Sequence, residues 1–226
     1  MAKRPVFVAK DSYPFYEIKE IDFTFHSGFA VSQKQRSISE LHDSYNKLFS
    51  EKVLEISSKS PDELGVALSA FNLMMNVDGE ERPVESIFQG SKCFEAGGPY
   101  VDLYNVSPWE AKKDERIRNS GELTGFELRD EHFGNEPKDY FYNWIYIRAM
   151  YQNGDYLEEL RSYGAFTDIE FNPKKSINCQ AKAIAIAVGL DKAGLLDDCM
   201  NDKSMFLETV YKQKKTCTYE QMSLFD

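Results

Sequence analysis

Histidine and cysteine, the usual ligands of zinc, are scarce in this sequence. Its three histidines, His26, His42 and His132, are far apart and form no HxxxH motif. No two cysteines have the CxxC spacing of a zinc site, and the chain lacks a dense disulfide framework. The four cysteines are Cys93, Cys179, Cys199 and Cys217. We therefore expect free thiols in a reducing compartment, no metal ion or redox cofactor, and neither a metal-dependent hydrolase nor a histidine-based triad.

Long apolar runs and an excess of positive charge are also missing. No stretch is apolar enough to span a bilayer, and the first ten residues lack the apolar core of a secretory signal, so we expect a cytoplasmic protein with no membrane partner. The 27 Lys and Arg residues face 37 Asp and Glu residues, for a net charge of -10. Such a chain is no general nucleic-acid coat, because nonspecific affinity comes from neutralising many phosphates. Any nucleic-acid substrate must be held at a local site.

The composition, with 42% hydrophobic residues, is that of a globular protein with a sizeable core. Alternating or continuous apolar runs predict strands at 21–31, 53–57, 123–128 and 166–171. Helical periodicity and capping signals predict helices at 38–49, after Ser60, at 84–97, 107–118, after Pro137, and at 156–163, 177–190 and 195–212. We predict a helix-rich α+β fold with a small sheet, one domain over residues 1–212 and a tail over 213–226.

The most informative segment is VESIFQGSK, residues 84–92. On a helix it places Glu85, Gln89 and Lys92 on one face, while the apolar side chains point toward a core. A carboxylate and an amine held together can shift each other's pKa and carry out acid-base or nucleophilic chemistry. The alternative interpretation is a pair of ordinary charged residues on an amphipathic helix.

Several other polar segments are candidates for ligand binding. Asp168 and Glu170 alternate with apolar residues, so on a strand both would lie on one side and accept hydrogen bonds from ribose hydroxyls; a solvated strand face would look the same. The SSKS segment, with Ser57, Ser58 and Lys59, follows a strand and could hold a pyrophosphate or simply cap a helix. Residues 33–36, QKQR, offer phosphate or guanine contacts or form a polar loop.

Phe71 and Asn72, in LSAFN, are suited to stacking on a nucleobase and hydrogen bonding to its edge. Phe71 could equally be a core residue.

Three segments together resemble a known family. LSAFN (68–72), VESIFQGSK (84–92) and DIEFNPKKSINCQA (168–181) are similar, in order and spacing, to the LSNF, TVEHYxQxxK and VEASPxDxIWGxG motifs of the NADAR, or YbiA-like, superfamily. Glu85, Gln89 and Lys92 fall on the Glu, Gln and Lys of the second motif. The phrases VSQKQ, LEISSKS and GPYVDLY resemble the antitoxin branch associated with DarT-type DNA ADP-ribosyltransferase toxins. Lys175 and Asn178 depart from the third motif, where Asp and Trp are common, which suggests a differently shaped base pocket.

The resemblance implies removal of ADP-ribose from the guanine amino group in DNA, reversing the toxin's modification. It implies essential roles for Glu85, as proton donor, and Lys92, which either attacks the sugar to form a Schiff base or remains a cation that orients Glu85. Implied partners are ADP-ribosylated single-stranded DNA, ADP-ribose and the cognate toxin. Two alternatives remain: an N-glycosidase for phosphorylated riboflavin-pathway intermediates, and an antitoxin that only binds its toxin. The candidate substrate-binding residues are Ser57, Ser58, Lys59, Phe71, Asn72, Gln89, Asp168, Glu170, Lys175 and Asn178.

The chain ends in a short peptide of a different kind. Its sequence, QMSLF, resembles the peptides with which bacterial polymerases and repair factors bind the DNA sliding clamp, a Gln followed by an apolar Leu-Phe pair. The candidate clamp-binding residues are Gln221, Met222, Ser223, Leu224 and Phe225. The alternative is a tail that folds back onto the domain.

Overall fold

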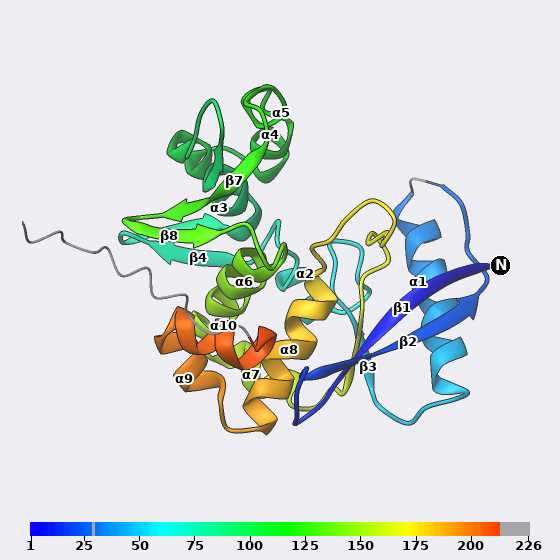
Figure 1. Cartoon of the computed structure of the whole chain (residues 1–226). Coiled ribbons are helices and arrows are strands. Elements are labelled where there is room, and N and C mark those ends of the chain that lie inside the picture. The colour runs from blue at the N-terminus through cyan, green and yellow to red at the C-terminus, as the bar shows by residue number, and fades with distance from the viewer. Residues whose placement is uncertain (29, 213–226) are drawn as a thin grey trace, which may run out of the picture.

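The computed structural model describes residues 1–28 and 30–212. Three amino-terminal strands and one later strand form a four-stranded sheet next to helix α1 (Val31–Asn46) (Figure 1). In spatial order the strands are β2 (Tyr16–Phe23), β1 (Ala2–Ala9), β9 (Ala165–Thr167) and β3 (Val53–Glu55). Strand β1 is antiparallel to both neighbours, whereas β9 and β3 are parallel. Because parallel strands end at the same edge, the segments that follow β3 and β9 leave the sheet side by side.

Strand β1 is buried on both faces, which explains its run of apolar residues. Val6 and Val8 point to one side and pack with Ile38 and Leu41 of α1. Phe7 lies on the other side, in the main apolar core. This two-residue periodicity lets one strand join two separate apolar clusters.

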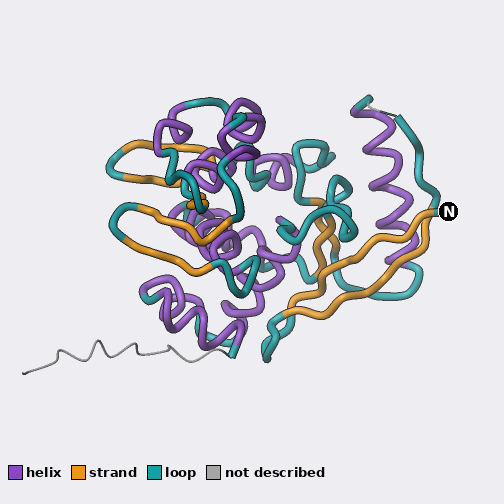
Figure 2. The backbone as a smooth tube through the Cα atoms, turned by 45° about the horizontal axis from the view of Figure 1, so that its top comes forward, coloured by secondary structure: helices purple, strands orange, loops and turns teal. Residues whose placement is uncertain are grey.

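Two almost fully buried helices, α6 (Tyr140–Gln152) and α8 (Gln180–Lys192), form the main core. Small alanines on α8 allow it to lie close to β1 and α6. Four shorter helices surround this pair: α2 (Glu63–Ala67), α7 (Asp155–Leu160), α9 (Leu196–Asn201) and α10 (Lys203–Tyr211). Figure 2 shows this helical region between strands on either side.

The other strands form two small sheets on the far side of the helical core. They are β4 (Met74–Val77) with β5 (Glu80–Pro83), and β6 (Lys92–Phe94) with β7 (Leu123–Leu128) and β8 (Glu131–Gly134). Helix α3 (Val84–Gly90) follows β5 and is buried along its whole length. The 3-10 helix η1 (Val101–Asn105), α4 (Pro108–Lys113) and α5 (Arg116–Asn119) connect β6 to β7.

The predicted α+β class is confirmed, and β7 occupies the predicted residues 123–128. The capping pattern at Ser107 is confirmed as well: its hydroxyl accepts the Glu110 N–H, and the Glu110 carboxylate accepts the Ser107 N–H. The charged helix expected to reach residue 118 is instead divided at Asp114 into α4 and α5.

Two boundaries near the candidate site were predicted wrongly. Helix α3 ends at Gly90, and Lys92 belongs to β6, where it pairs with Phe126 of β7 instead of continuing the helix. The strand expected over 166–171 ends at Thr167, because the Asp168 carboxylate accepts the N–H groups of residues 170 and 171 and closes a turn. Asp168 is therefore buried and Glu170 exposed, and they do not share a strand face.

Other boundaries shift for similar reasons. The strand predicted over 21–31 is β2, which ends at Phe23, and α1 already begins at Val31. Asp62, not Ser60, caps α2 by accepting the Leu64 N–H. The long aromatic helix starts at residue 140, α8 starts at residue 180, and the last predicted helix is interrupted at Asp202, whose carboxylate caps α10.

Residues 213–226 lie outside the described residues, and so do Cys217 and the candidate clamp-binding peptide at 221–225. The other three cysteines, Cys93, Cys179 and Cys199, are free thiols. Within residues 1–28 and 30–212, none of the helices has both the length and the apolar character needed to cross a membrane.

Candidate active site

A cavity of about 710 Å³ lies where the segments after β3 and β9 meet α3 and α4. Predicted site residues from four separate parts of the chain line it: Ser57, Ser58, Lys59, Phe71, Asn72, Glu85, Gln89, Asp168, Glu170 and Asn178. Two predicted residues, Lys92 and Lys175, do not line it. Lys175 is exposed, while Lys92 lies behind Gln89.

Sequence reasoning missed several residues that line the same cavity. Trp109 and Lys112 come from α4, Tyr142 from α6 and Gln180 from the start of α8. The charged helix at 107–118 and the aromatic helix after Pro137 were recognised as helices, but neither pattern indicated which side chains face a cavity. Tyr142 is only 5% exposed and also belongs to the main apolar core.

Glu85, Gln89 and Lys92 form one hydrogen-bonded chain. The Gln89 Nε2 donates to Glu85 Oε1 over 2.9 Å, and Lys92 Nζ donates to Gln89 Oε1 over 2.6 Å. The orientation of the Gln89 amide follows from its neighbours, because an ammonium can only donate and a carboxylate can only accept. Gln89 therefore couples the two predicted catalytic groups, even though Lys92 stands on β6 and not on α3.

Burial lowers the pKa of Lys92 to about 8, with the Lys112 ammonium adding to the effect and the Glu85 carboxylate opposing it. The side chain also lies over the Phe88 ring, with Nζ 4.7 Å from the ring centre. With a pKa of about 8, roughly one Lys92 amine in ten is neutral at pH 7. A neutral amine is a nucleophile, so this environment suits the chemistry expected of Lys92.

Lys112 provides a second cation beside Glu85. Its Nζ lies 3.4 Å from Glu85 Oε1, and its side chain is about half exposed, at 52%. The position of this lysine depends on α4, which begins with the capping box at Ser107 and with Pro108 in its first turn.

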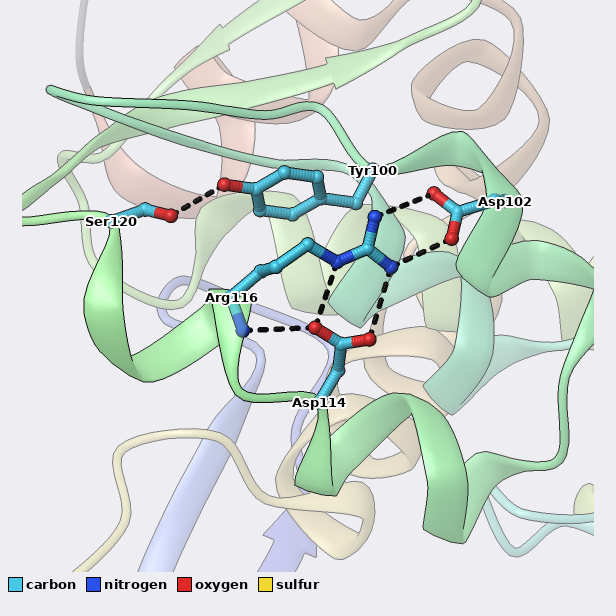
Figure 3. Close-up of polar contacts among 5 residues, drawn as sticks. All are labelled: Tyr100, Asp102, Asp114, Arg116 and Ser120. Carbon is cyan, nitrogen blue, oxygen red and sulfur yellow. Dashed lines mark hydrogen bonds and ion pairs between the residues drawn. The ribbon is translucent and has the colours of Figure 1, made fainter.

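Arg116 holds the far end of α4 in place (Figure 3). Its guanidinium donates to both oxygens of Asp102 on η1, over 3.2 and 2.6 Å, and to both oxygens of Asp114 at the end of α4, over 2.9 and 3.0 Å. The Tyr100 ring lies 4.6 Å from the guanidinium carbon, and its hydroxyl is hydrogen bonded to Ser120. This cluster connects η1, α4 and α5, so the wall that carries Lys112 is well ordered.

The opposite wall is organised by two buried carboxylates. Asp168 accepts the Gln180 side-chain amide over 3.1 Å, in addition to the two N–H groups of its turn. Glu55 on β3 accepts the Ile169 N–H over 2.8 Å and the Thr167 hydroxyl over 2.6 Å. Burial raises the pKa of Asp168 to about 6 and that of Glu55 to about 7. The carboxylates thus tie the turn after β9 to both β3 and α8.

The polar contacts of three other candidate substrate-binding residues, Ser57, Glu170 and Asn178, differ from one another. The Ser57 hydroxyl accepts the Lys59 N–H over 3.2 Å, so the 57–60 segment is a tight turn. The exposed Glu170 forms an ion pair with Lys34 of α1 over 3.0 Å, which brings the predicted 33–36 segment to the rim of the cavity but not into it. The Asn178 Oδ1 is buried and has no hydrogen-bond partner within the part of the chain that is described.

A glycine on α2, Gly65, allows this helix to lie close to β3. At Gly65 on α2, an added Cβ would lie 2.0 Å from the Glu55 carbonyl oxygen and 2.3 Å from the Ser60 hydroxyl. Only a residue without a side chain fits between β3 and α2 at this point. In the described ranges, no three His, Cys, Asp or Glu side chains gather closely enough to hold a metal ion.

Comparison with known proteins identified a family whose model matches this chain. The model of that family, described as DarT1-associated NADAR antitoxin, matches residues 2–220, whereas no curated protein matches the chain. The match covers every residue of the cavity and stops just before the candidate clamp-binding peptide. It agrees with the resemblance found in the three sequence motifs, two of which supply Glu85, Gln89 and Asp168 to the cavity. The chain therefore belongs to the DarT1-associated NADAR antitoxin family.

Proposed function

We propose that this antitoxin is an enzyme that hydrolyses the N-glycosidic bond between ADP-ribose and the guanine amino group in DNA, and so reverses the modification made by its cognate DarT-type toxin. The observation that carries the proposal is the Glu85–Gln89–Lys92 chain at the wall of a cavity of about 710 Å³. That volume lies in the range of roughly 300–1,000 Å³ found for sites that bury drug-sized ligands.

Glu85 is the proposed proton donor. Breaking the glycosidic bond leaves the electron pair on the guanine nitrogen, which must take up a proton. Glu85 is largely buried at 6% exposure and lines the cavity, so its carboxyl group can reach a ligand held there.

Lys92 is the proposed nucleophile. Its neutral Nζ forms a bond to the anomeric carbon as the bond from that carbon to guanine breaks. The lysine nitrogen then loses a proton and expels the ring oxygen, which is protonated, to give a Schiff base with the opened ribose. Water adds to the same carbon and releases free ADP-ribose and the amine. In the structure Nζ donates a hydrogen bond to Gln89 and lies behind it, outside the lining of the cavity. Attack therefore requires this hydrogen bond to open and the Gln89 side chain to move aside.

The remaining walls support binding of ADP-ribose. The 57–60 turn, with Lys59, offers hydroxyl groups and positive charge for a pyrophosphate. Glu170 and Asp168 are acceptors for ribose hydroxyls, and the buried Asn178 Oδ1 is an acceptor that a ligand N–H or hydroxyl group would satisfy.

One assay tests the proposal. A guanine-ADP-ribosylated oligonucleotide, freed of toxin, is incubated with the protein, and we expect unmodified DNA together with free ADP-ribose. Glu85→Gln and Lys92→Met should each abolish release without unfolding the domain. Glu158→Gln and Lys192→Met, which change exposed residues of α7 and α8 in the same way, serve as matched controls.

The two alternatives give different results in the same experiment. An antitoxin that only binds its toxin would protect cells yet produce no turnover. An N-glycosidase of the riboflavin pathway would release the base from a phosphorylated pyrimidine intermediate and leave the oligonucleotide modified. Full activity of both Glu85→Gln and Lys92→Met would show that the catalytic assignment is wrong.

A further inference from the structure

The α4 side of the cavity carries an unusual exposed aromatic residue. Trp109 is 61% exposed, although it lines the cavity. Its ring centre lies 5.5 Å from that of Phe71, at an interplanar angle of 57°. A tryptophan this exposed contributes little to the core, so much of its surface is accessible to a ligand.

Two lysines flank this aromatic pair. Lys112 Nζ lies 5.4 Å from the centre of the Phe71 ring, and Lys113 Nζ lies 5.2 Å from the Trp109 ring. Lys112 also pairs with Glu85 at the wall of the cavity, whereas Lys113 has no ion pair with any residue in the described part of the chain. On a chain with a net charge of -10, these two lysines form a local positive patch that favours a negatively charged ligand.

The surface runs outward from the cavity. Trp109 and Lys112 line it, but Lys113 does not, so the positive and aromatic surface continues past the rim. A small ligand would need no such extension, whereas a polymer has to leave the cavity on at least one side of the residue that is acted on. The cluster around Arg116 keeps α4 in position, so the surface is ordered before any ligand arrives.

We propose that Trp109, Phe71, Lys112 and Lys113 bind the single-stranded polynucleotide next to the modified guanine, with an unpaired base stacked on Trp109 and its phosphates near the two lysines. Aromatic rings beside cations are the recurring way in which proteins hold single strands, because every base has a face that can stack. In a duplex the bases are already stacked on each other, so they are not free to stack on Trp109. This inference rests on the proposed function, and it adds the residues that hold the strand.

Direct binding tests the inference without any turnover. The chain has two tryptophans, and the second, Trp144, is only 3% exposed, so changes in fluorescence on adding DNA report on Trp109. We expect an unmodified single-stranded oligonucleotide to quench the fluorescence at low salt, and a duplex of the same sequence to quench it far less. The quench should be absent in Trp109→Phe, in which only Trp144 emits. No quench by the single strand would overturn the inference even if the enzyme is active.

Kinetics provide the second test, with two substrates that share the reacting bond. One is a modified guanine within a single-stranded DNA oligonucleotide, and the other is the ADP-ribosylated deoxyguanosine released from it by nuclease and phosphatase. Trp109→Ala should raise KM for the oligonucleotide by about 5- to 150-fold, from the usual strength of base stacking. KM for the nucleoside should change little, and Trp109→Phe should restore most of the loss on the oligonucleotide.

Salt dependence tests the role of the lysines. For the oligonucleotide, Lys113→Ala should reduce the slope of log KM against log salt by about 0.7, as expected for one lost phosphate contact on a single strand. Lys192→Ala, which removes an exposed lysine from α8, should leave the slope unchanged. An unaltered slope in Lys113→Ala would remove the lysine from the proposal.

The outcomes separate this inference from others. Equal losses on both substrates would mean that Trp109 contacts the ADP-ribosylated deoxyguanosine itself, and would overturn the inference. Weaker binding of purified toxin by Trp109→Ala, with oligonucleotide binding intact, would identify the surface as a protein-docking site instead. If the wild type turns over neither substrate but binds the single strand through Trp109, the proposed function fails and the binding surface remains.

Discussion

Replacing Glu55 by glutamine should make the protein more stable at alkaline pH. Glu55 lies under the cavity wall, where its carboxylate accepts the Ile169 N–H and the Thr167 hydroxyl. The Thr167 oxygen is in turn 2.8 Å from His42 Nε2. In Glu55→Gln the amide oxygen can keep the Ile169 bond. The amide N–H₂ can donate to Thr167, whose hydroxyl then donates to His42, so the chain of hydrogen bonds reverses without losing a member.

The size and sign of the effect follow from the pKa values. Burial raises the pKa of Glu55 in the folded protein to about 7, from an ordinary 4.5. The folded protein therefore binds its proton more tightly than the unfolded chain does, and folding stability falls as pH rises from about 4.5 to 7. At about 1.4 kcal/mol for each tenfold change in proton affinity, the loss between pH 5 and pH 8 is about 2–3 kcal/mol.

His42 titrates in the opposite direction, which is why the variant must be compared with the wild type at each pH. Burial lowers the pKa of His42 to about 4, so its contribution to stability rises between pH 4 and about 6.5 and masks part of the loss from Glu55. Both proteins contain His42, so its contribution cancels in the difference between them. That difference reports on Glu55 together with its repulsion of the neighbouring buried Asp168 carboxylate.

The assay is urea unfolding of the wild type and Glu55→Gln at pH 5 and pH 8. We expect the free energy of unfolding of the variant, relative to wild type, to increase by about 2–3 kcal/mol from pH 5 to pH 8. Glu158→Gln, which neutralises an exposed carboxylate on α7, serves as the matched control. A difference for Glu55→Gln that is constant, or that decreases as pH rises, would refute the reasoning.

Three further predictions concern the site and the tail. Gly65→Ala places a Cβ 2.0 Å from a carbonyl oxygen of β3 and should lower the free energy of unfolding, measured with urea, by about 1–3 kcal/mol. Gly154→Ala, whose added Cβ would have no atom within 4 Å, should change the free energy of unfolding little. Borohydride added during turnover should trap ADP-ribose on Lys92, and the yield of the adduct should rise around pH 8 as the amine becomes neutral. If the measured mass of the intact protein shows no adduct at any pH, Lys92 has only an orienting role. A peptide of residues 213–226 should bind purified sliding clamp in fluorescence anisotropy, and no saturable binding, or binding unaffected by alanine at Leu224 and Phe225, would end that proposal.

Local patterns in the sequence were sufficient to predict that Glu85 and Gln89 of α3 lie together. The spacing of Glu85 and Gln89 on one helical face is a property of any helix, so their contact could be predicted. The capping box at Ser107 was equally predictable, because all of its atoms lie within four consecutive residues. Lys92 was expected beside them for the wrong reason. It is the first residue of β6, which pairs with β7, and its side chain reaches back to Gln89 three residues earlier.

The sequence alone determined the α+β class, the family motifs and most of the polar residues that line the cavity, since these depend on residue type and on neighbours a few positions away. The tertiary structure decided which of these residues meet. Strands β3 and β9 are parallel although more than a hundred residues separate them, and only their pairing brings the 57–60 turn next to Asp168. The same holds for Trp109 and Lys112, whose place at the cavity depends on Arg116 joining α4 to η1. Contacts between distant segments arise from packing and pairing across the whole chain, and no local pattern of residues contains them.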